Sequence, residues 1–278
     1  MKILIIGGDK RTLEIIRILK HDNYIDIIGF KNLDLDTIDI NNLNIHEYDA
    51  IIFPLNGIQD DYTVNCPFND LNINVKNINF HLSENCIIFS GTESNKLDEL
   101  FGKNYKKLMS CEDVAAENSI PTAEGIISNI IENTDETINN ANITVLGYGK
   151  VGKTLTQKLL ALGANVNIGV IEEADYISLI YKNIKVFYTF DMQNALSKSK
   201  IIINTVPKLL LDKTNLDYVK NDAYIIDISS APFGVDFEYA ENKNLKYSIL
   251  KGIPGKVAPK TAGAILAKKI KKILKEGL

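Results

Sequence analysis

The stretch that decides the fold reads Asn142-Ile143-Thr144-Val145-Leu146-Gly147-Tyr148-Gly149-Lys150-Val151-Gly152-Lys153-Thr154-Leu155. Residues 143–146 form a short apolar run with a bias to β-branched side chains, which is typical of a buried parallel strand. Three glycines follow with the spacing G-x-G-x-x-G, and leucines then recur at helical intervals up to Leu162. Strand, glycine turn and helix in this order predict a Rossmann unit that binds a dinucleotide.

Each glycine of the turn has a separate physical role. Gly147 makes the tight turn, Gly149 lets the backbone approach a pyrophosphate, and Gly152 lets the helix pack on the strand. The helix N-terminus offers N–H groups and partial positive charge to the phosphates. A Rossmann-like turn with an empty phosphate site is the alternative interpretation. The residues expected to bind NADP or NAD here are Gly147, Tyr148, Gly149, Lys150, Val151 and Gly152.

Further apolar runs extend this sheet. Strands are expected at 165–170, 184–187, 201–205 and 224–228. Ligands of such sheets lie outside the carboxyl ends of the strands, where an acidic residue after the second strand suits the ribose of NAD and an arginine suits the phosphate of NADP. Here Glu172 follows the second strand without an arginine, which favours NAD on charge. The predicted cofactor contacts at these ends are Glu172, Thr205, Val206, Pro207 and Ser229.

The first part of the chain carries a second strand–glycine–helix unit. Residues 2–6 are a predicted strand, Gly7 and Gly8 make a turn, and a helix follows. The turn is either a simple βα connection or an anion site that includes Arg11. Arg11 and Arg17 are the only arginines of the chain, and arginine alone offers a planar fork for a carboxylate. Further strands are expected at 25–30, 48–54 and 86–91, and the Asn-rich segment 56–85 is expected to be mostly loop.

Two helix starts flank the Rossmann segment. Ser119 is a suitable N-cap and Pro121 fits a first helical turn, so a helix is expected from there to Asn133, connecting two domains. Thr122 and Glu124 would then lie near an interdomain cleft, although capping and the helix dipole alone also explain Ser119 and Glu124. Near the end of the chain, a Gly- and Pro-rich loop at 252–263 precedes a helix.

These patterns predict an α/β fold with two doubly wound parallel-sheet domains and a cleft between them. Residues 1–118 would form the substrate-side domain and 119–259 the Rossmann NAD(P)-binding domain, with a C-terminal helix at 260–278 returning to the first domain.

Composition limits the partners and the compartment. The net charge of −4 argues against a nucleic-acid or anionic-membrane partner, and no apolar run reaches the length of a membrane span. The three cysteines contain no C-x-x-C pair, so neither a disulfide framework nor a metal site is expected. We therefore expect a soluble, cytoplasmic protein.

Several blocks together resemble the dipicolinate synthase A-subunit family, and the match runs nearly from end to end. The Gly252–Gly263 block, with Pro-Gly and Ala-Pro-Lys-Thr-Ala-Gly, is the most specific of them. In two places the chain departs from the family pattern: segment 56–85 has diverged, and Ile171 stands where the family has an arginine, which puts NADP preference in doubt. The other blocks are Ile6–Asp9 with Arg11 and Leu13–Arg17, Ile88–Gly91, Asn118–Gly125, Gly147–Gly152 and Asp236–Ala240.

The resemblance implies an oxidoreductase that converts a dihydrodipicolinate, formed from a lysine-pathway intermediate, into pyridine-2,6-dicarboxylate with NADP⁺ or NAD⁺. It also implies, as partner, the flavoprotein-like B-subunit of dipicolinate synthase, and a role in the mother-cell cytoplasm during sporulation. A homo-oligomer is left open. For the dicarboxylate substrate, the expected binding residues are Arg11, Ser90, Ser119, Thr122, Lys260 and Thr261. The catalytic base is unassigned, with Glu124 as a candidate.

Two other functions compete with this one. A 2-hydroxyacid dehydrogenase normally needs a histidine late in the chain, and here no histidine follows His81. A dinucleotide-binding regulatory protein without chemistry stays open, because no acid/base pair is evident.

Overall fold

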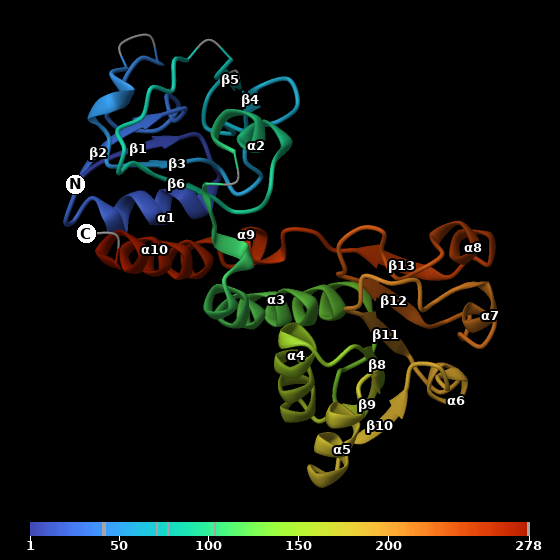
Figure 1. The fold of residues 1–278 in the computed structure, drawn as a ribbon. Coiled ribbons are helices and arrows are strands. Elements are labelled where there is room, and N and C mark those ends of the chain that lie inside the picture. Colours follow the sequence, from blue (N-terminus) through green and yellow to red (C-terminus); the bar gives the residue numbers. More distant parts are fainter. Residues whose placement is uncertain (41–42, 71, 77, 103, 277–278) are drawn as a thin grey trace. The chain divides into compact units, whose positions relative to one another are not determined.

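The structure is a computed structural model that describes residues 1–40, 43–70, 72–76, 78–102 and 104–276. The chain divides into two compact units (Figure 1): unit 1 is Met1–Asn118 together with the segment from Pro254 onwards, and unit 2 is Ser119–Ile253. Unit 2 is therefore inserted within the sequence of unit 1. Residues 254–259, which the sequence analysis assigned to the Rossmann domain, belong to unit 1, because Gly255 lies against the side chain of Arg11.

Unit 1 is built on an all-parallel sheet in the order β2-β1-β3-β6-β7. This doubly wound order places the switch point between β1 and β3, where ligands of such sheets bind. The strands are short and their apolar residues are buried on both faces, as parallel strands require. The bounds are β1 (Lys2–Ile6), β2 (Tyr24–Ile28), β3 (Ala50–Ile52), β6 (Ile87–Ser90) and β7 (Lys106–Lys107).

One face of this sheet is covered by two helices that are far apart in sequence. In Figure 1, α1 and α10 lie side by side below the strands, and Ile16 of α1 and Ile270 of α10 share one apolar core with Ile3 and Ile5. The predicted loop at 252–263 is wrong, because its residues form α9 and the first turn of α10. Residues 277–278 of the predicted C-terminal helix lie outside the described residues. The helices are α1 (Lys10–Leu19), α2 (Asn95–Phe101), α9 (Ile253–Val257) and α10 (Pro259–Glu276).

The Asn-rich segment 56–85 contains little regular structure where it is described. It holds one antiparallel pair of two-residue strands, β4 (Thr63–Val64) and β5 (Ile73–Asn74). Residues 71 and 77 of the segment lie outside the described residues. Val64 and Cys66 of the segment are buried in the second core of unit 1 together with Leu4 and Ile6 of β1, so the segment covers the face opposite α1 and α10. Cys66 is one of three free thiols.

An ion pair joins the turn that follows α1 to α10 and gives their contact a pH dependence. Lys271 donates to the Asp22 carboxylate at 2.6 Å, and this bond, with a second from His21, lowers the pKa of Asp22 to about 2. The pKa of Asp22 is lower in the folded than in the unfolded chain, so the ion pair stabilises the folded state wherever Asp22 is ionised in both. This stabilisation is complete above about pH 4 and is lost as the pH falls towards 2. NMR titration should give a midpoint near 2 for Asp22. In Lys271→Met the midpoint should rise towards 3.8, and an unchanged midpoint would contradict the assignment.

Unit 2 has the Rossmann architecture. Its all-parallel sheet runs in the order β10-β9-β8-β11-β12-β13, which read by position in the unit is 3-2-1-4-5-6. The predicted strands are present within one or two residues at each end, and β13 is an additional strand. The bounds are β8 (Asn142–Leu146), β9 (Asn165–Val170), β10 (Lys185–Tyr188), β11 (Ile201–Asn204), β12 (Tyr224–Asp227) and β13 (Lys246–Ile249).

Helices cover both faces of this sheet. Side chains of α3, α4 and α5 share one apolar core with the strands, and those of α6, α7 and α8 share the other. The predicted start of α3 at Ser119 is wrong: the helix begins at Glu112, whose acidic first turn complements the helix dipole, and Pro121 lies inside it. The bounds are α3 (Glu112–Asn133), α4 (Lys150–Ala161), α5 (Glu173–Tyr181), α6 (Gln193–Leu196), α7 (Lys213–Leu216) and α8 (Phe237–Asn242).

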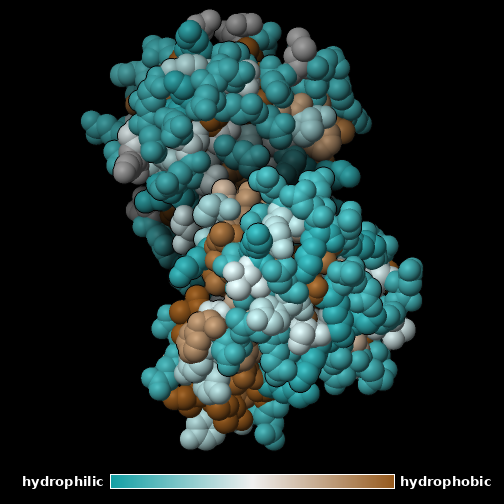
Figure 2. Space-filling view, turned by 90° about the vertical axis from the view of Figure 1, so that its right-hand side faces the viewer, coloured by the Kyte–Doolittle hydropathy of each residue, from teal (hydrophilic) through white to brown (hydrophobic). Residues whose placement is uncertain are grey.

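Exposed apolar side chains gather around α5. Figure 2 shows this apolar surface at the lower end of the view, at the height where Figure 1 has α5. The rings of Tyr176, Tyr188 and Phe190 stack in succession, with centroids 4.5 and 5.1 Å apart. The exposed residues of this surface are Ile171, Ile177, Ile180, Tyr181 and Phe190. Within the described ranges, no helix is both long and apolar enough to cross a membrane.

Candidate cofactor and substrate sites

The glycine turn of unit 2 leaves no room for side chains at its first and third positions. Gly147 has φ +100°, and a Cβ there would overlap the Thr205 hydroxyl and lie 2.7 Å from Cγ2 of Val206. A Cβ on Gly152 would overlap the carbonyl oxygen of Gly147. The first helical turn of α4 therefore sits directly on the end of β8, as the motif predicts.

The second glycine is different, because the space in front of it is open. Gly149 is the N-cap residue of α4, and no side chain caps the helix. A Cβ on Gly149 would meet no protein atom within 4 Å. An open backbone at the N-terminus of a 12-residue helix has the donors and the partial positive charge that a pyrophosphate requires. The turn therefore fits the phosphates of a dinucleotide.

Two buried polar residues end the neighbouring strands β11 and β12. Asn204 and Asp227 are both fully buried, and the Asn204 amide donates to the Asp227 carboxylate at 3.3 Å and to the carbonyl of Val206 at 2.9 Å. The Asp227 carboxylate also accepts the backbone N–H groups of Ser229 (2.7 Å) and Gly234 (2.9 Å). This network fixes the two loops that leave the carboxyl ends of β11 and β12, and sequence analysis missed both residues.

Ser229 presents an unused hydroxyl at this edge of the sheet. The residue is 6% exposed, and its Oγ has no hydrogen-bond partner among the described residues. A buried hydroxyl without a partner is costly unless a ligand or water satisfies it. Thr205, by contrast, donates its hydroxyl to the carbonyl of Leu146 at 2.9 Å and so holds its own loop against β8.

The other predicted cofactor residues take different positions. The Tyr148 side chain is buried in the core, with the Lys153 ammonium 5.1 Å from its ring centroid, so only its backbone can serve the turn. Lys150 is exposed in the first turn of α4, and Val151 packs against the core. Glu172 is the exposed N-cap residue of α5, two residues after the end of β9, and Pro207 is exposed after β11. Glu172 therefore lies just beyond the strand end at which a ribose-binding acid is expected.

In unit 1, Arg11 lies in the first turn of α1 and binds Asp9. The Arg11 Nε lies 3.0 Å from both oxygens of the Asp9 carboxylate, and Nη2 also donates to Asp9. Asp9 is at the same time the N-cap residue of α1 and accepts the backbone N–H of Arg11 at 2.9 Å. The Arg11 side chain is only 16% exposed. Arg17 is 70% exposed and pairs with Glu14, which makes it a surface residue.

The remaining predicted substrate residues of unit 1 are less well placed. Ser90 ends β6 and is fully buried, and its hydroxyl donates to the carbonyl of Pro54 at 3.3 Å. Lys260 and Thr261 are exposed in the first turn of α10. Lys260 lies near Glu14 of α1 and helps to lower the pKa of its carboxyl, after the larger effect of the hydrogen bond from Arg17.

The helix-start site expected at Ser119 and Thr122 is wrong, because both residues lie within α3. Ser119 is buried, and its hydroxyl is 2.7 Å from that of Thr154, so it joins α3 to α4. Glu124 accepts a hydrogen bond from Lys158 at 2.9 Å, and its side chain is 56% exposed.

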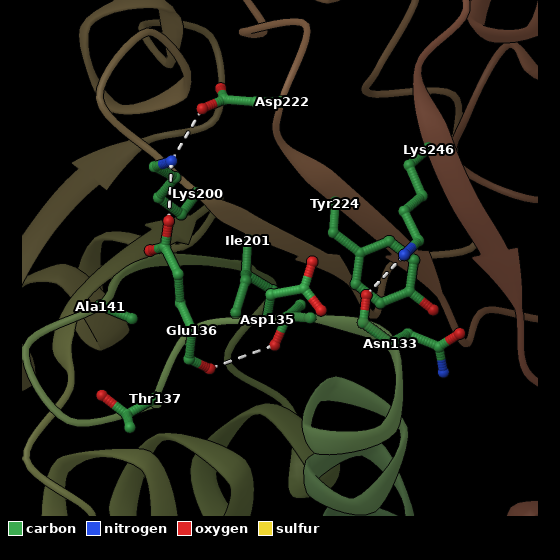
Figure 3. Close-up of a pocket in the computed structure, with 11 residues that line it drawn as sticks. Asn133, Asp135, Glu136, Thr137, Ala141, Lys200, Ile201, Asp222, Tyr224 and Lys246 are labelled. Atoms are coloured by element: carbon green, nitrogen blue, oxygen red, sulfur yellow. Dashed lines mark hydrogen bonds and ion pairs between the residues drawn. The ribbon is translucent and has the colours of Figure 1, made fainter.

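A cavity of about 310 Å³ lies at the other end of the unit 2 sheet, where β11, β12 and β13 begin (Figure 3). Its lysines are already paired: Lys200 donates to Glu136 at 3.1 Å and to Asp222 at 2.7 Å, which lowers the pKa of the Asp222 carboxyl. Lys246 donates to the carbonyl of Asn133 at 2.6 Å. The strands are parallel, so this cavity is remote from the glycine turn and belongs to the base of the sheet.

Two family models match successive parts of the chain. Residues 2–111 match the family model of the N-terminal domain of the dipicolinate synthase A-subunit, and residues 118–266 match that of the S-adenosyl-L-homocysteine hydrolase NAD binding domain. The chain is 35% identical over 286 aligned positions to the dipicolinate synthase A-subunit of Bacillus subtilis (strain 168), covering 99% of this chain and 96% of that protein. The chain belongs to the dipicolinate synthase A-subunit family. The resemblance seen in the sequence is thereby confirmed.

Solved structures extend the comparison to three dimensions. The dipicolinate synthase A-subunit of Bacillus halodurans superimposes with a TM-score of 0.93 at 36% identity, covering 98% of this chain and 97% of that one. An L-alanine dehydrogenase superimposes with a TM-score of 0.62 at 12% identity, covering 99% and 89%. The second likeness shows the fold alone. The predicted α/β fold with two parallel sheets and a Rossmann-like C-terminal domain is confirmed, and the family shares the two-domain dehydrogenase architecture.

Proposed function

We propose that this protein is the NAD(P)-dependent oxidoreductase subunit of a dipicolinate synthase, acting in the cytoplasm of a sporulating cell. Its reaction would convert a dihydrodipicolinate into pyridine-2,6-dicarboxylate. The observation that carries the proposal is the open phosphate site at Gly149 in a chain that matches the A-subunit of Bacillus subtilis along nearly its full length.

The reaction requires one hydride acceptor and the loss of one proton. When bound, the nicotinamide cofactor would accept the hydride from a ring carbon, and a further ring hydrogen would leave as the single proton, to a base or to water, as the ring becomes aromatic. The unused Ser229 hydroxyl and the loops fixed by Asn204 and Asp227 would position the cofactor's nicotinamide half. We assign no residue as base, since Glu124 is exposed and paired with Lys158.

For the choice of nucleotide, we propose NAD. Glu172 follows β9, where an acid suits the ribose hydroxyls of NAD and repels the 2′-phosphate of NADP. Both arginines of the chain belong to unit 1, so unit 2 itself offers no arginine to a 2′-phosphate.

For the substrate, we propose that Arg11 binds one of the two carboxylates. Arg11→Lys keeps the charge but loses the planar fork, so KM for dihydrodipicolinate should rise by about tenfold while kcat changes little. Steady-state kinetics at fixed NAD⁺ would measure this. The matched control is Arg17→Lys on the exposed side of the same helix, which should leave KM unchanged. Equal KM values in the wild type and Arg11→Lys would remove Arg11 from the site.

The test of the function is a turnover assay on freshly generated dihydrodipicolinate, with NAD⁺ and NADP⁺ in parallel. The family name implies that a second, B-subunit exists, so the assay should be run with and without this flavoprotein-like partner that we propose. Dipicolinate formed in step with reduced nucleotide would establish the reaction and the cofactor. Bound nucleotide without product in any combination would favour a regulatory, non-catalytic role instead.

A further inference from the structure

The side chain of Arg11 is enclosed by two elements that are distant in sequence. On one side it is bound by Asp9, the N-cap residue of its own helix. On the other side lies Gly255 of α9, where a Cβ would be 2.8 Å from both Cζ and Nε of Arg11. The guanidinium therefore lies directly against the backbone of Gly255, and any side chain at that position would displace it.

This enclosure leaves one edge of the guanidinium unused. Arginine has five N–H donors in a fixed plane. The bonds to Asp9 use Nε and Nη2, and among the described residues Nη1 has no hydrogen-bond partner. With Nε held by the carboxylate and the plane held by Gly255, the direction in which Nη1 points is fixed before any ligand arrives.

We propose that Gly255 is a positioning residue, which sets the plane of the Arg11 guanidinium so that its free edge can receive a substrate carboxylate. This inference rests on the proposed role of Arg11 in substrate binding. A guanidinium whose plane is already fixed loses little further conformational entropy when the ligand binds. This pre-organisation favours tight and specific binding of a carboxylate. It also gives the Pro-Gly of α9 a function that its helical conformation does not explain.

The variant to make is Gly255→Ala. The atoms that the new methyl group would meet are the far end of a flexible side chain, so the fold can adapt by moving the guanidinium. We expect an unchanged Tm, a KM for dihydrodipicolinate raised about tenfold and a kcat within about twofold of wild type. In an Arg11→Ala background, Gly255→Ala should have no further effect on KM, because it acts only through Arg11.

Two controls separate positioning from general destabilisation. Gly263→Ala places its Cβ 2.7 Å from Cβ of Glu14 and over the backbone carbonyl of Arg11, so it should lower Tm by separating α10 from α1. Val257→Ala changes an exposed residue of the same short helix and should change neither Tm nor KM. A KM increase that is equal with and without Arg11 would overturn the positioning role.

A second readout does not depend on turnover. The chain has only two arginines, so ¹⁵N NMR of the Nε–H groups resolves Arg11 once Arg17→Lys removes the other signal. Gly255→Ala should shift the Arg11 signal and speed its exchange with water, and an unchanged signal would overturn the proposal. Added dipicolinate should shift the wild-type signal; if it does not, the proposed substrate role of Arg11 fails while the contact with Gly255 is still tested.

Discussion

We expect Gly149→Ala to bind NAD⁺ or NADP⁺ about a hundredfold more weakly than the wild type, a loss of roughly 2.7 kcal/mol. The added methyl group would occupy the open space at the N-terminus of α4, which a pyrophosphate needs. The backbone there is extended, with φ −71°, so alanine can adopt it. Replacing a glycine N-cap with alanine costs less than about 1 kcal/mol, so the protein should remain folded. Calorimetric titration with each nucleotide measures the effect.

Gly152→Ala is the matched comparison for this prediction. Its Cβ would overlap the carbonyl oxygen of Gly147, and a backbone atom cannot move aside as a side chain can. This variant should lose about 1–3 kcal/mol of stability as well as nucleotide affinity. If Gly149→Ala bound nucleotide as tightly as the wild type, the turn would not be a phosphate site.

The second large effect is expected for Asp227→Asn. The carboxylate accepts hydrogen bonds on both oxygens, from two backbone N–H groups and from the Asn204 amide. An asparagine side chain has a single oxygen, so its NH₂ group must face one of these buried N–H donors. The free energy of unfolding should therefore fall by about 1–3 kcal/mol. Urea unfolding measures this change. Nucleotide binding should weaken as well, because the loop of Ser229 and Gly234 loses its anchor.

The control for Asp227→Asn is an exposed aspartate of the same unit. Asp222 lies at the other end of the sheet, where its exposed carboxylate accepts from the Lys200 side chain, so Asp222→Asn should be much less destabilising. Equal losses in the two variants would mean that the buried network does not hold the loops.

The local sequence pattern is sufficient to predict five of the six strands of the unit 2 sheet, β8 to β12. An apolar run that ends in a glycine turn and changes to helical spacing identifies β8 and α4 within two residues. The predicted start of α3 is too late, because proline is typical of a first helical turn, whereas this helix has Pro121 in its interior. The acidic pair Glu112–Asp113 was the available signal for the true start. Strand β13 was missed because its four residues alternate polar and apolar without a continuous apolar run.

The sites were harder to predict because their contacts are long-range. Asn204 and Asp227 each end an apolar strand with a polar residue, which is a readable signal, but only the parallel pairing of β11 with β12 brings them together. The contact between Gly255 and Arg11 joins residues at opposite ends of the chain. No local rule reports such a pair, since it depends on how α9 returns to unit 1.

The insertion of unit 2 within unit 1 determines the order in which the two units can be completed during synthesis. All residues of unit 2 are contiguous, so the ribosome has delivered its whole core before α10 is made. The core of unit 1 can be completed only after α10 has been synthesised, because Leu266 and Ile270 of α10 complete the apolar core over Ile3 and Ile5. Until α10 has been made, α1 alone covers that face of the first sheet, and such a partly covered apolar face is where a nascent chain is prone to aggregate and a chaperone can bind.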